Sequence, residues 1–195
     1  MVECTGFENQ QGRKLLRGSN PLVSAAYTRT TMTAQRSILF VCTANVFRSV
    51  AAAGCFKKYL AGNNLDGWEV GSAGIVADSE VVDPTVLEAL RELGIDASAH
   101  QQRRLTREIL EGYDAVVGMA ENHIEFMKSE CKYQRAVLFN ELAVNEKTSI
   151  FDIDTIPDYK HNRPAVEDKL RRTVQYICDN TPAVYQSVIK RFYSA

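Results

Sequence analysis

Cys42 and Arg48 carry the clearest chemical signal in the sequence. Five residues separate them and a serine follows, in the stretch Cys42-Thr43-Ala44-Asn45-Val46-Phe47-Arg48-Ser49. A cysteine thiolate is a strong nucleophile, and a planar guanidinium can donate two parallel hydrogen bonds to phosphate oxygens. The Ser49 hydroxyl can donate to the thiolate. The spacing therefore predicts a phosphate-binding loop in which Cys42 attacks phosphorus while Arg48 holds the phosphate oxygens.

An apolar run precedes this loop and a helical pattern follows it. Residues 37–41 are apolar and partly β-branched, which is typical of a buried parallel strand. Residues 51–60 are rich in alanine, with Phe56 and Leu60 on one helical face. A loop between a strand and a helix N-terminus turns successive backbone N–H groups toward an anion. The context favours a site that stabilises both a thiolate and a bound phosphate.

Strand and helix patterns alternate along the rest of the chain. Asp83 and Pro84 are typical of a helix start, Gly94 of a helix end, and Pro182 predicts a break in the last helix. The alternation predicts right-handed βαβ units and a parallel sheet, with the active site at the carboxyl ends of the strands. Further strands are expected at residues 69–72, 114–118 and 135–139, and further helices at 84–93, 106–110, 121–130 and 165–193.

Composition excludes several classes of function. Hydrophobic residues make up 45% of the chain, and 23 basic against 24 acidic residues give a net charge of -1. This balance argues against a nucleic-acid or membrane partner. The 5 cysteines are widely spaced and form no CxxC pair, so we expect no structural zinc and free thiols in a reducing cytoplasm. Small core residues are expected at Cys55, Cys131 and Cys178, and structural histidines at His100 and His123.

The first 36 residues differ from the remainder of the chain. They are rich in polar residues and show no sustained apolar period. An organelle transit peptide and an upstream start ahead of Met32 are alternatives, but Glu3 and Glu8 do not fit the transit pattern. We predict a disordered extension at residues 1–36 and a single domain at residues 37–195.

The stretch from Val41 to Phe56 resembles the loop of the low-molecular-weight protein tyrosine phosphatase family, which usually reads V-C-x-G-N-x-C-R-S-P. The similarity extends over residues 37–193, with further matching segments at 71–74, 83–84, 93–96, 100–106 and 114–119. It implies an α/β fold with an open four-stranded parallel sheet, flavodoxin-like, with helices on both faces. It also implies hydrolysis of phosphotyrosine in a protein or peptide through a cysteinyl-phosphate intermediate, with neither metal nor cofactor. We expect a cytoplasmic monomer or weak dimer.

The resemblance also implies the site residues. The family takes its general acid from a D-P-Y loop, for which the counterpart here is Asp158 followed by Tyr159, with Asp152 and Asp154 as alternatives. Tyr159 would line the entrance and stack on an aromatic substrate. The catalytic set is therefore Cys42, Arg48 and Asp158, and the expected substrate-binding residues are Thr43, Ala44, Asn45, Val46, Phe47, Ser49 and Tyr159.

Three loop positions depart from the family pattern. Ala44 replaces a glycine, Phe47 replaces a second cysteine, and Val50 replaces a proline. A methyl group at Ala44 would strain the backbone if that position required a positive φ. Phe47 removes the thiol that in relatives can form a disulfide with the nucleophile, so oxidised Cys42 would lack that partner.

Other functions are compatible with the same loop. Arsenate reduction on this fold needs a relay of further cysteines, but Met119 stands where a relay thiol is expected. A catalytically weak phosphate-binding or regulatory module would keep the loop without turnover. Relatives that prefer phosphoarginine often carry threonine at the position of Val46, which is closer to the isoleucine of tyrosine-directed members.

Overall fold

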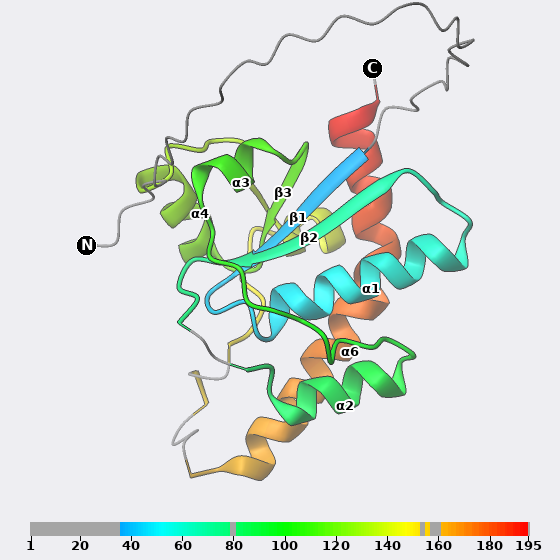
Figure 1. Ribbon diagram of the computed structural model, residues 1–195, viewed down its shortest axis with the longest axis vertical. Coiled ribbons are helices and arrows are strands. Elements are labelled where there is room, and N and C mark those ends of the chain that lie inside the picture. Colours follow the sequence, from blue (N-terminus) through cyan, green and yellow to red (C-terminus); the bar gives the residue numbers. More distant parts are fainter. Residues whose placement is uncertain (1–35, 79–80, 153–154, 157–160, 195) are drawn as a thin grey trace, which may run out of the picture.

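The central strand of the sheet is β1, which ends at Cys42. The computed structural model describes residues 36–78, 81–152, 155–156 and 161–194. Its four strands lie parallel in the order β2-β1-β3-β4 (Figure 1). This arrangement confirms the predicted four-stranded, flavodoxin-like sheet. The strands are β1 (Arg36–Cys42), β2 (Trp68–Gly74), β3 (Ala115–Gly118) and β4 (Val137–Leu138).

Helices cover both faces of this sheet, as predicted. On one face, Phe40 of β1 packs against Phe56, with their ring centroids 5.7 Å apart, in a cluster that includes residues of α1, α2, α5 and α6. On the other face, Leu39 and Val41 share a cluster with residues of α3 and α4. The helices are α1 (Arg48–Gly62), α2 (Pro84–Glu92), α3 (Arg107–Glu111), α4 (Glu121–Ser129), α5 (Phe139–Val144) and α6 (Arg163–Val188), followed by a π-helical turn, η2 (Ile189–Tyr193).

The predicted end signals of the short helices are confirmed. The Asp83 side chain accepts a hydrogen bond from the Thr85 backbone N–H, and Pro84 is the first residue of α2. Gly94 follows the helix with a φ of 71°, a left-handed conformation that glycine adopts without strain. The Thr106 hydroxyl caps α3 through the Ile109 N–H. Local side-chain chemistry therefore determines these boundaries.

The region after β3 differs from the prediction. A strand was expected over residues 135–139, but β4 holds only Val137 and Leu138. Phe139 instead begins α5, a helix that the sequence did not indicate, and buries its ring together with Leu142. A short apolar run has no period that distinguishes a strand from a helix. Packing against α6 decides in favour of the helix here.

The predicted break at Pro182 is wrong, because α6 continues through this residue. Proline costs a helix one backbone hydrogen bond. The neighbouring Thr181 hydroxyl donates to the Ile177 carbonyl oxygen at 2.9 Å, and Val184 and Val188 continue the buried face beyond the proline. Burial of this face stabilises the uninterrupted helix. None of the described helices, α6 included, combines the length and the apolar character that a membrane crossing requires.

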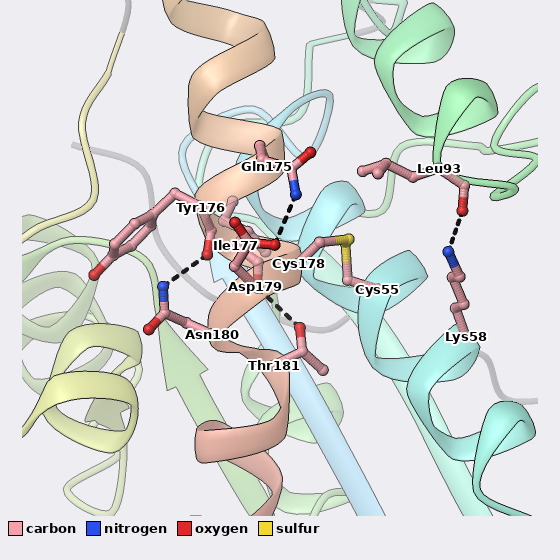
Figure 2. The surroundings of a disulfide bond; sticks show 10 residues. All are labelled: Cys55, Lys58, Leu93, Gln175, Tyr176, Ile177, Cys178, Asp179, Asn180 and Thr181. Carbon is pink, nitrogen blue, oxygen red and sulfur yellow. Dashed lines mark hydrogen bonds between the residues drawn. A yellow bond between two sulfur atoms is a disulfide. The ribbon is translucent and has the colours of Figure 1, made fainter.

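A disulfide bond joins α1 to α6. Cys55 of α1 and Cys178 of α6 face each other with their Cα atoms 5.1 Å apart (Figure 2). The prediction that these two cysteines are free core thiols is therefore wrong, whereas Cys42 and Cys131 are buried and not disulfide-bonded. The pairing follows from the packing of the two helices, which a spacing of 123 residues along the chain does not reveal.

Reduction of this disulfide should lower the free energy of unfolding. The bond closes a loop across a separation of 123 residues, for which the chain-entropy model gives up to about 5 kcal/mol. Urea unfolding with and without a phosphine reductant measures the difference. The double variant Cys55→Ser/Cys178→Ser is the control, because its midpoint should not respond to the reductant. An unchanged wild-type midpoint after complete reduction would contradict the prediction.

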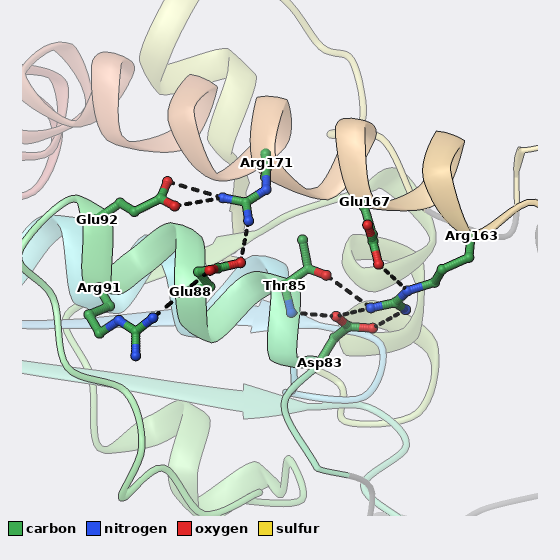
Figure 3. Close-up of polar contacts among 8 residues, drawn as sticks. All are labelled: Asp83, Thr85, Glu88, Arg91, Glu92, Arg163, Glu167 and Arg171. Carbon is green, nitrogen blue, oxygen red and sulfur yellow. Dashed lines mark hydrogen bonds and ion pairs between the residues drawn. The ribbon is translucent and has the colours of Figure 1, made fainter.

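Ion pairs tie α2 to the first half of α6 (Figure 3). Arg163, the first residue of α6, donates to both carboxylate oxygens of Asp83, and Arg171 pairs with Glu88 and Glu92. Burial acts to raise the pKa of Asp83, but hydrogen bonds from Arg163 and from the chain outweigh it and lower that pKa. Single exposed pairs contribute little, but together they fix the start of α6, which follows Asp158 in the sequence.

Candidate functional site

The residues from Cys42 to Ser49 form one continuous strand-loop-helix unit. Cys42 is the last residue of β1, and Arg48 is the first residue of α1. The chain after β1 leads to β2 on one side, while β3 lies on the other side, so Cys42 stands where the strand order reverses. Ligands of open α/β sheets bind at such a point. The first turn of α1 directs its free N–H groups toward the same place.

Gly74 allows the end of β2 to approach the loop closely. A Cβ atom at this position would lie 2.8 Å from the Asn45 nitrogen and 2.8 Å from the Thr43 carbonyl oxygen. Just beyond it, the Val76 N–H donates to the Thr43 carbonyl oxygen at 2.9 Å. A larger residue at Gly74 would therefore push the loop out of place.

Asn45 holds the loop together from inside. It is fully buried and has a φ of 56°, and its amide nitrogen donates to the hydroxyl oxygens of Ser49 and Ser72, both at 2.9 Å. Its amide oxygen accepts from the Arg103 backbone N–H at 2.9 Å, and its carbonyl oxygen accepts from His100 Nε2 at 2.8 Å. The left-handed residue of the loop is therefore Asn45, and Ala44 is not among the positive-φ residues. The alanine at position 44 does not strain the backbone.

Ser49 places its hydroxyl beside the nucleophile candidate. Its Oγ lies 3.0 Å from Cys42 Sγ and accepts a hydrogen bond from the Asn45 amide. Because the oxygen already accepts from Asn45, the hydroxyl proton is free to point at the sulfur. A donor at this distance stabilises a thiolate.

The Arg48 guanidinium is buried and held by three groups. It is 3% exposed, and it donates to the Thr43 hydroxyl at 3.0 Å and to the Ile150 carbonyl oxygen at 3.2 Å. It also forms an ion pair with Asp152. Asp152 is one of the two alternatives to Asp158 as general acid, and the structure pairs it with the arginine.

His123 reaches the loop from the first turn of α4. Its Nε2 lies 3.1 Å from the Thr43 hydroxyl oxygen, and its ring is fully buried. Burial, together with the positive charge of Arg48, lowers the pKa of His123 from 6.5 to about 3. The imidazole is therefore neutral at neutral pH. The sequence pattern gave no reason to assign His123 to the site.

The neutral state of His123 predicts a dependence of stability on pH. Between pH 6.5 and about 3, the unfolded chain binds a proton at His123 that the folded chain does not bind. The free energy of unfolding should therefore decrease as the pH falls through this range, by at most about 1.4 kcal/mol per pH unit from this group. Urea unfolding at pH 7 and pH 5 measures it. His123→Gln should flatten the dependence. Equal slopes in wild type and His123→Gln would argue against this assignment.

The structure brings together most of the residues that the sequence predicted for the site. Asp158, Tyr159 and Asp154 lie outside the described residues. Val46 is half-buried against the core and Phe47 is buried just before α1. Sequence reasoning missed the supports from distant segments, which reach the loop only through folding: His100, Gln102, Arg103, His123 and Ile150.

Comparisons with known proteins identify the family. Residues 37–191 match the family model described as low molecular weight phosphotyrosine protein phosphatase, which confirms the predicted family. Arsenate reductase 2 of Staphylococcus haemolyticus is 41% identical over 83 residues, which are 43% of this chain and 59% of that relative. The chain thus covers less than two thirds of the length of this relative.

Solved structures share the fold over most of their length. The YwlE arginine phosphatase of Bacillus subtilis superposes with a TM-score of 0.68 at 24% identity, covering 80% of this chain and 97% of that chain. The low molecular weight protein tyrosine phosphatase from T. tengcongensis gives a TM-score of 0.65 at 26% identity, covering 77% of this chain and 98% of that chain.

Proposed function

Because the chain belongs to the low molecular weight phosphotyrosine protein phosphatase family, we propose that it hydrolyses phosphotyrosine in proteins or peptides with Cys42 as its nucleophile. One observation carries this proposal. Cys42 Sγ lies 3.0 Å from the Ser49 hydroxyl, at the end of the strand that leads through one loop to the buried Arg48. A nucleophile, a donor that stabilises its thiolate and a cation for phosphate oxygens therefore belong to one strand-loop-helix unit.

The reaction would proceed in two displacements at phosphorus. The Cys42 thiolate attacks the phosphorus atom, the bond to the tyrosine oxygen breaks, and that oxygen takes a proton from Asp158. A water molecule then attacks the cysteinyl-phosphate, gives a proton to the Asp158 carboxylate, and inorganic phosphate leaves as the S–P bond breaks. Arg48 and the loop N–H groups stabilise the equatorial oxygens in both steps.

The general acid is assigned to Asp158 by its resemblance to the family's acid loop. Asp152 supports this choice indirectly, because it is ion-paired with Arg48. The carboxylate in this pair is engaged by the guanidinium, whereas a general acid has to face the leaving group. Asp152 is better suited to hold the guanidinium than to protonate a leaving group.

Asp158→Asn should therefore slow hydrolysis in a way that depends on the leaving group. We expect kcat on phenyl phosphate to fall by about 10²-fold or more, because phenoxide needs protonation. The loss on p-nitrophenyl phosphate should be smaller, because nitrophenoxide leaves without it. Asp152→Asn is the matched comparison and should show no such dependence. The reverse pattern in steady-state kinetics would transfer the acid role to Asp152.

The choice of phosphotyrosine over phosphoarginine rests on Val46. This side chain is apolar, carries no hydroxyl and packs partly against the core. An apolar side chain in the phosphate-binding loop suits an aromatic ring better than a polar guanidino group. We therefore place the substrate with the tyrosine-directed members of the family, although YwlE is named an arginine phosphatase.

A competition between matched peptides tests this proposal. Two peptides of one sequence carry either phosphotyrosine or phosphoarginine, and kcat/KM is measured for each. Wild type should prefer phosphotyrosine, and Val46→Thr should shift the ratio toward phosphoarginine. Clear preference of wild type for phosphoarginine would overturn the substrate assignment, and hydrolysis of neither peptide would overturn the proposed activity.

Arsenate reduction is the second candidate, because relatives such as that of Staphylococcus haemolyticus are named arsenate reductases. Such a reaction needs thiols that relay electrons to the nucleophile. In the described part of the chain, Cys55 and Cys178 are bonded to each other, and Cys131 belongs to the core cluster on the sheet face opposite that of Cys42. This arrangement supports phosphate hydrolysis. Thioredoxin-dependent turnover of arsenate would favour the reductase instead.

A further inference from the structure

The Thr43 hydroxyl lies between a cation and a neutral base. Its oxygen is 3.0 Å from Arg48 Nη2 on one side and 3.1 Å from His123 Nε2 on the other. Arg48 and His123 are buried, whereas Thr43 is only half-buried. The side chains of His123, Thr43 and Arg48 thus form a continuous row that leads from the buried side of α4 to the phosphate-binding loop.

The direction of the hydrogen bonds in this row follows from the donors available. A guanidinium has no acceptor, so the Thr43 oxygen accepts from Arg48. The threonine proton is then free to point at His123, where a neutral imidazole offers a lone pair on Nε2. A protonated imidazole would donate instead and would place a second positive charge near Arg48. In this arrangement His123 carries its proton on Nδ1, whereas in the other tautomer Nε2 would donate to the second lone pair of the Thr43 oxygen.

The other ring nitrogen shows that packing alone does not explain His123. Nδ1 is buried and has no hydrogen-bond partner among the residues that the structure describes. A buried polar group without a partner costs stability. An apolar side chain would avoid this cost, whereas the histidine provides the contact of Nε2 with the Thr43 hydroxyl.

The sheet explains how α4 reaches the loop. β3 lies beside β1, with Gly118 opposite Val41, and the Met119 N–H donates to the Val41 carbonyl oxygen. α4 therefore starts next to the loop that follows Cys42. A Cβ atom at Gly118 would lie 2.7 Å from the Ile124 Cδ1 atom. Glycine at this position therefore allows the first turn of α4, which carries His123, to lie close to the end of β3.

We propose that His123 is a positioning residue for the phosphate-binding loop. Its Nε2 accepts a hydrogen bond from the Thr43 hydroxyl. This bond orients the lone pairs of the Thr43 oxygen toward Arg48 and thereby fixes the direction of the guanidinium. The inference rests on the proposed function, because it assigns a role within the same phosphate site. It predicts that His123 and Thr43 act on phosphate through one shared interaction.

A double-mutant cycle tests this coupling. The variants are Thr43→Val, His123→Leu and the double variant, and the measured quantity is the dissociation constant of inorganic phosphate by calorimetry. Each single change should weaken binding by about tenfold, as expected for a hydrogen bond to a charged group. The double variant should be no weaker than either single variant. In His123→Gln the amide oxygen can accept the same hydrogen bond from the Thr43 hydroxyl. This variant should bind inorganic phosphate with a dissociation constant within about threefold of wild type.

The proposal would be overturned if Thr43→Val and His123→Leu weakened phosphate binding independently of each other. In that case the double variant would lose the product of the two factors, about 100-fold. The proposal would also be overturned if a folded His123→Leu chain bound phosphate with the affinity of wild type. If His123→Leu does not fold, the ¹⁵N chemical shifts of His123 at neutral pH decide, because the proposal requires an unprotonated Nε2 and a protonated one contradicts it.

The phosphate calorimetry of these variants, together with a hydrolysis assay on a phosphopeptide, separates this inference from the proposed function. A wild-type chain that binds phosphate with the expected coupling but hydrolyses no phosphopeptide would sink the proposed activity and leave the role of His123 intact. A wild-type chain that hydrolyses the phosphopeptide, with independent losses of phosphate affinity in the Thr43 and His123 variants, would support the proposed activity and overturn the role of His123. A wild-type chain that does not bind phosphate would overturn both.

Discussion

Replacing Cys42 by serine is expected to abolish phosphotyrosine hydrolysis, with a loss in kcat of at least about 10⁴-fold. The Ser49 hydroxyl, which can donate a hydrogen bond, lies 3.0 Å from Cys42 Sγ. Donors stabilise a thiolate that has already lost its proton, but they do not remove a proton from a serine hydroxyl. The measurement is the turnover of a phosphotyrosine peptide by both proteins.

Binding of phosphate should survive this change. Arg48 and its partners Thr43 and Ile150 are untouched by the substitution, so the dissociation constant of inorganic phosphate should stay within about threefold of wild type. Cys131→Ser is the matched control, because Cys131 is also buried and not disulfide-bonded but lies in the other core cluster. Equal and negligible rates in wild type and Cys42→Ser would instead indicate a phosphate-binding module without turnover.

Replacing Arg48 by lysine should lower kcat/KM by about 10²- to 10³-fold. Lysine keeps the charge but offers a single ammonium group instead of a planar pair of donors. The Thr43 hydroxyl and the Ile150 carbonyl oxygen hold the guanidinium in one plane, and an ammonium group cannot satisfy both and still present two donors to phosphate. Kinetics on the same peptide and phosphate calorimetry measure the loss.

The pattern across two quantities distinguishes this variant from Cys42→Ser. Arg48→Lys should weaken phosphate binding as well as turnover, whereas Cys42→Ser should affect turnover alone. Arg107→Lys is the control, because Arg107 is an exposed arginine of α3 that pairs with Glu111, and it should behave as wild type. Unchanged phosphate affinity in Arg48→Lys would remove the arginine from the proposed cradle.

The sequence by itself determined the parts of the protein that depend on near neighbours. The loop from Cys42 to Ser49 lies between a strand and a helix, and the Cys42–Ser49 contact spans only seven positions. The caps at Asp83 and Thr106 involve residues two or three positions away. Such contacts follow from local backbone geometry and side-chain chemistry. The apolar patterns also predicted the parallel sheet, because a strand buried on both faces is apolar throughout.

The tertiary structure alone decided which distant residues support the loop. Asp152 pairs with Arg48 across 104 positions, His123 meets Thr43 across 80, and Cys55 bonds to Cys178 across 123. Each pair meets because separate strands and helices pack side by side, and the sequence carries no period that encodes such a meeting. The uninterrupted course of α6 through Pro182 has the same origin, since burial of its face outweighs the local preference of proline. Local preferences specify the loop and its nucleophile, whereas packing specifies how the arginine beside it is held.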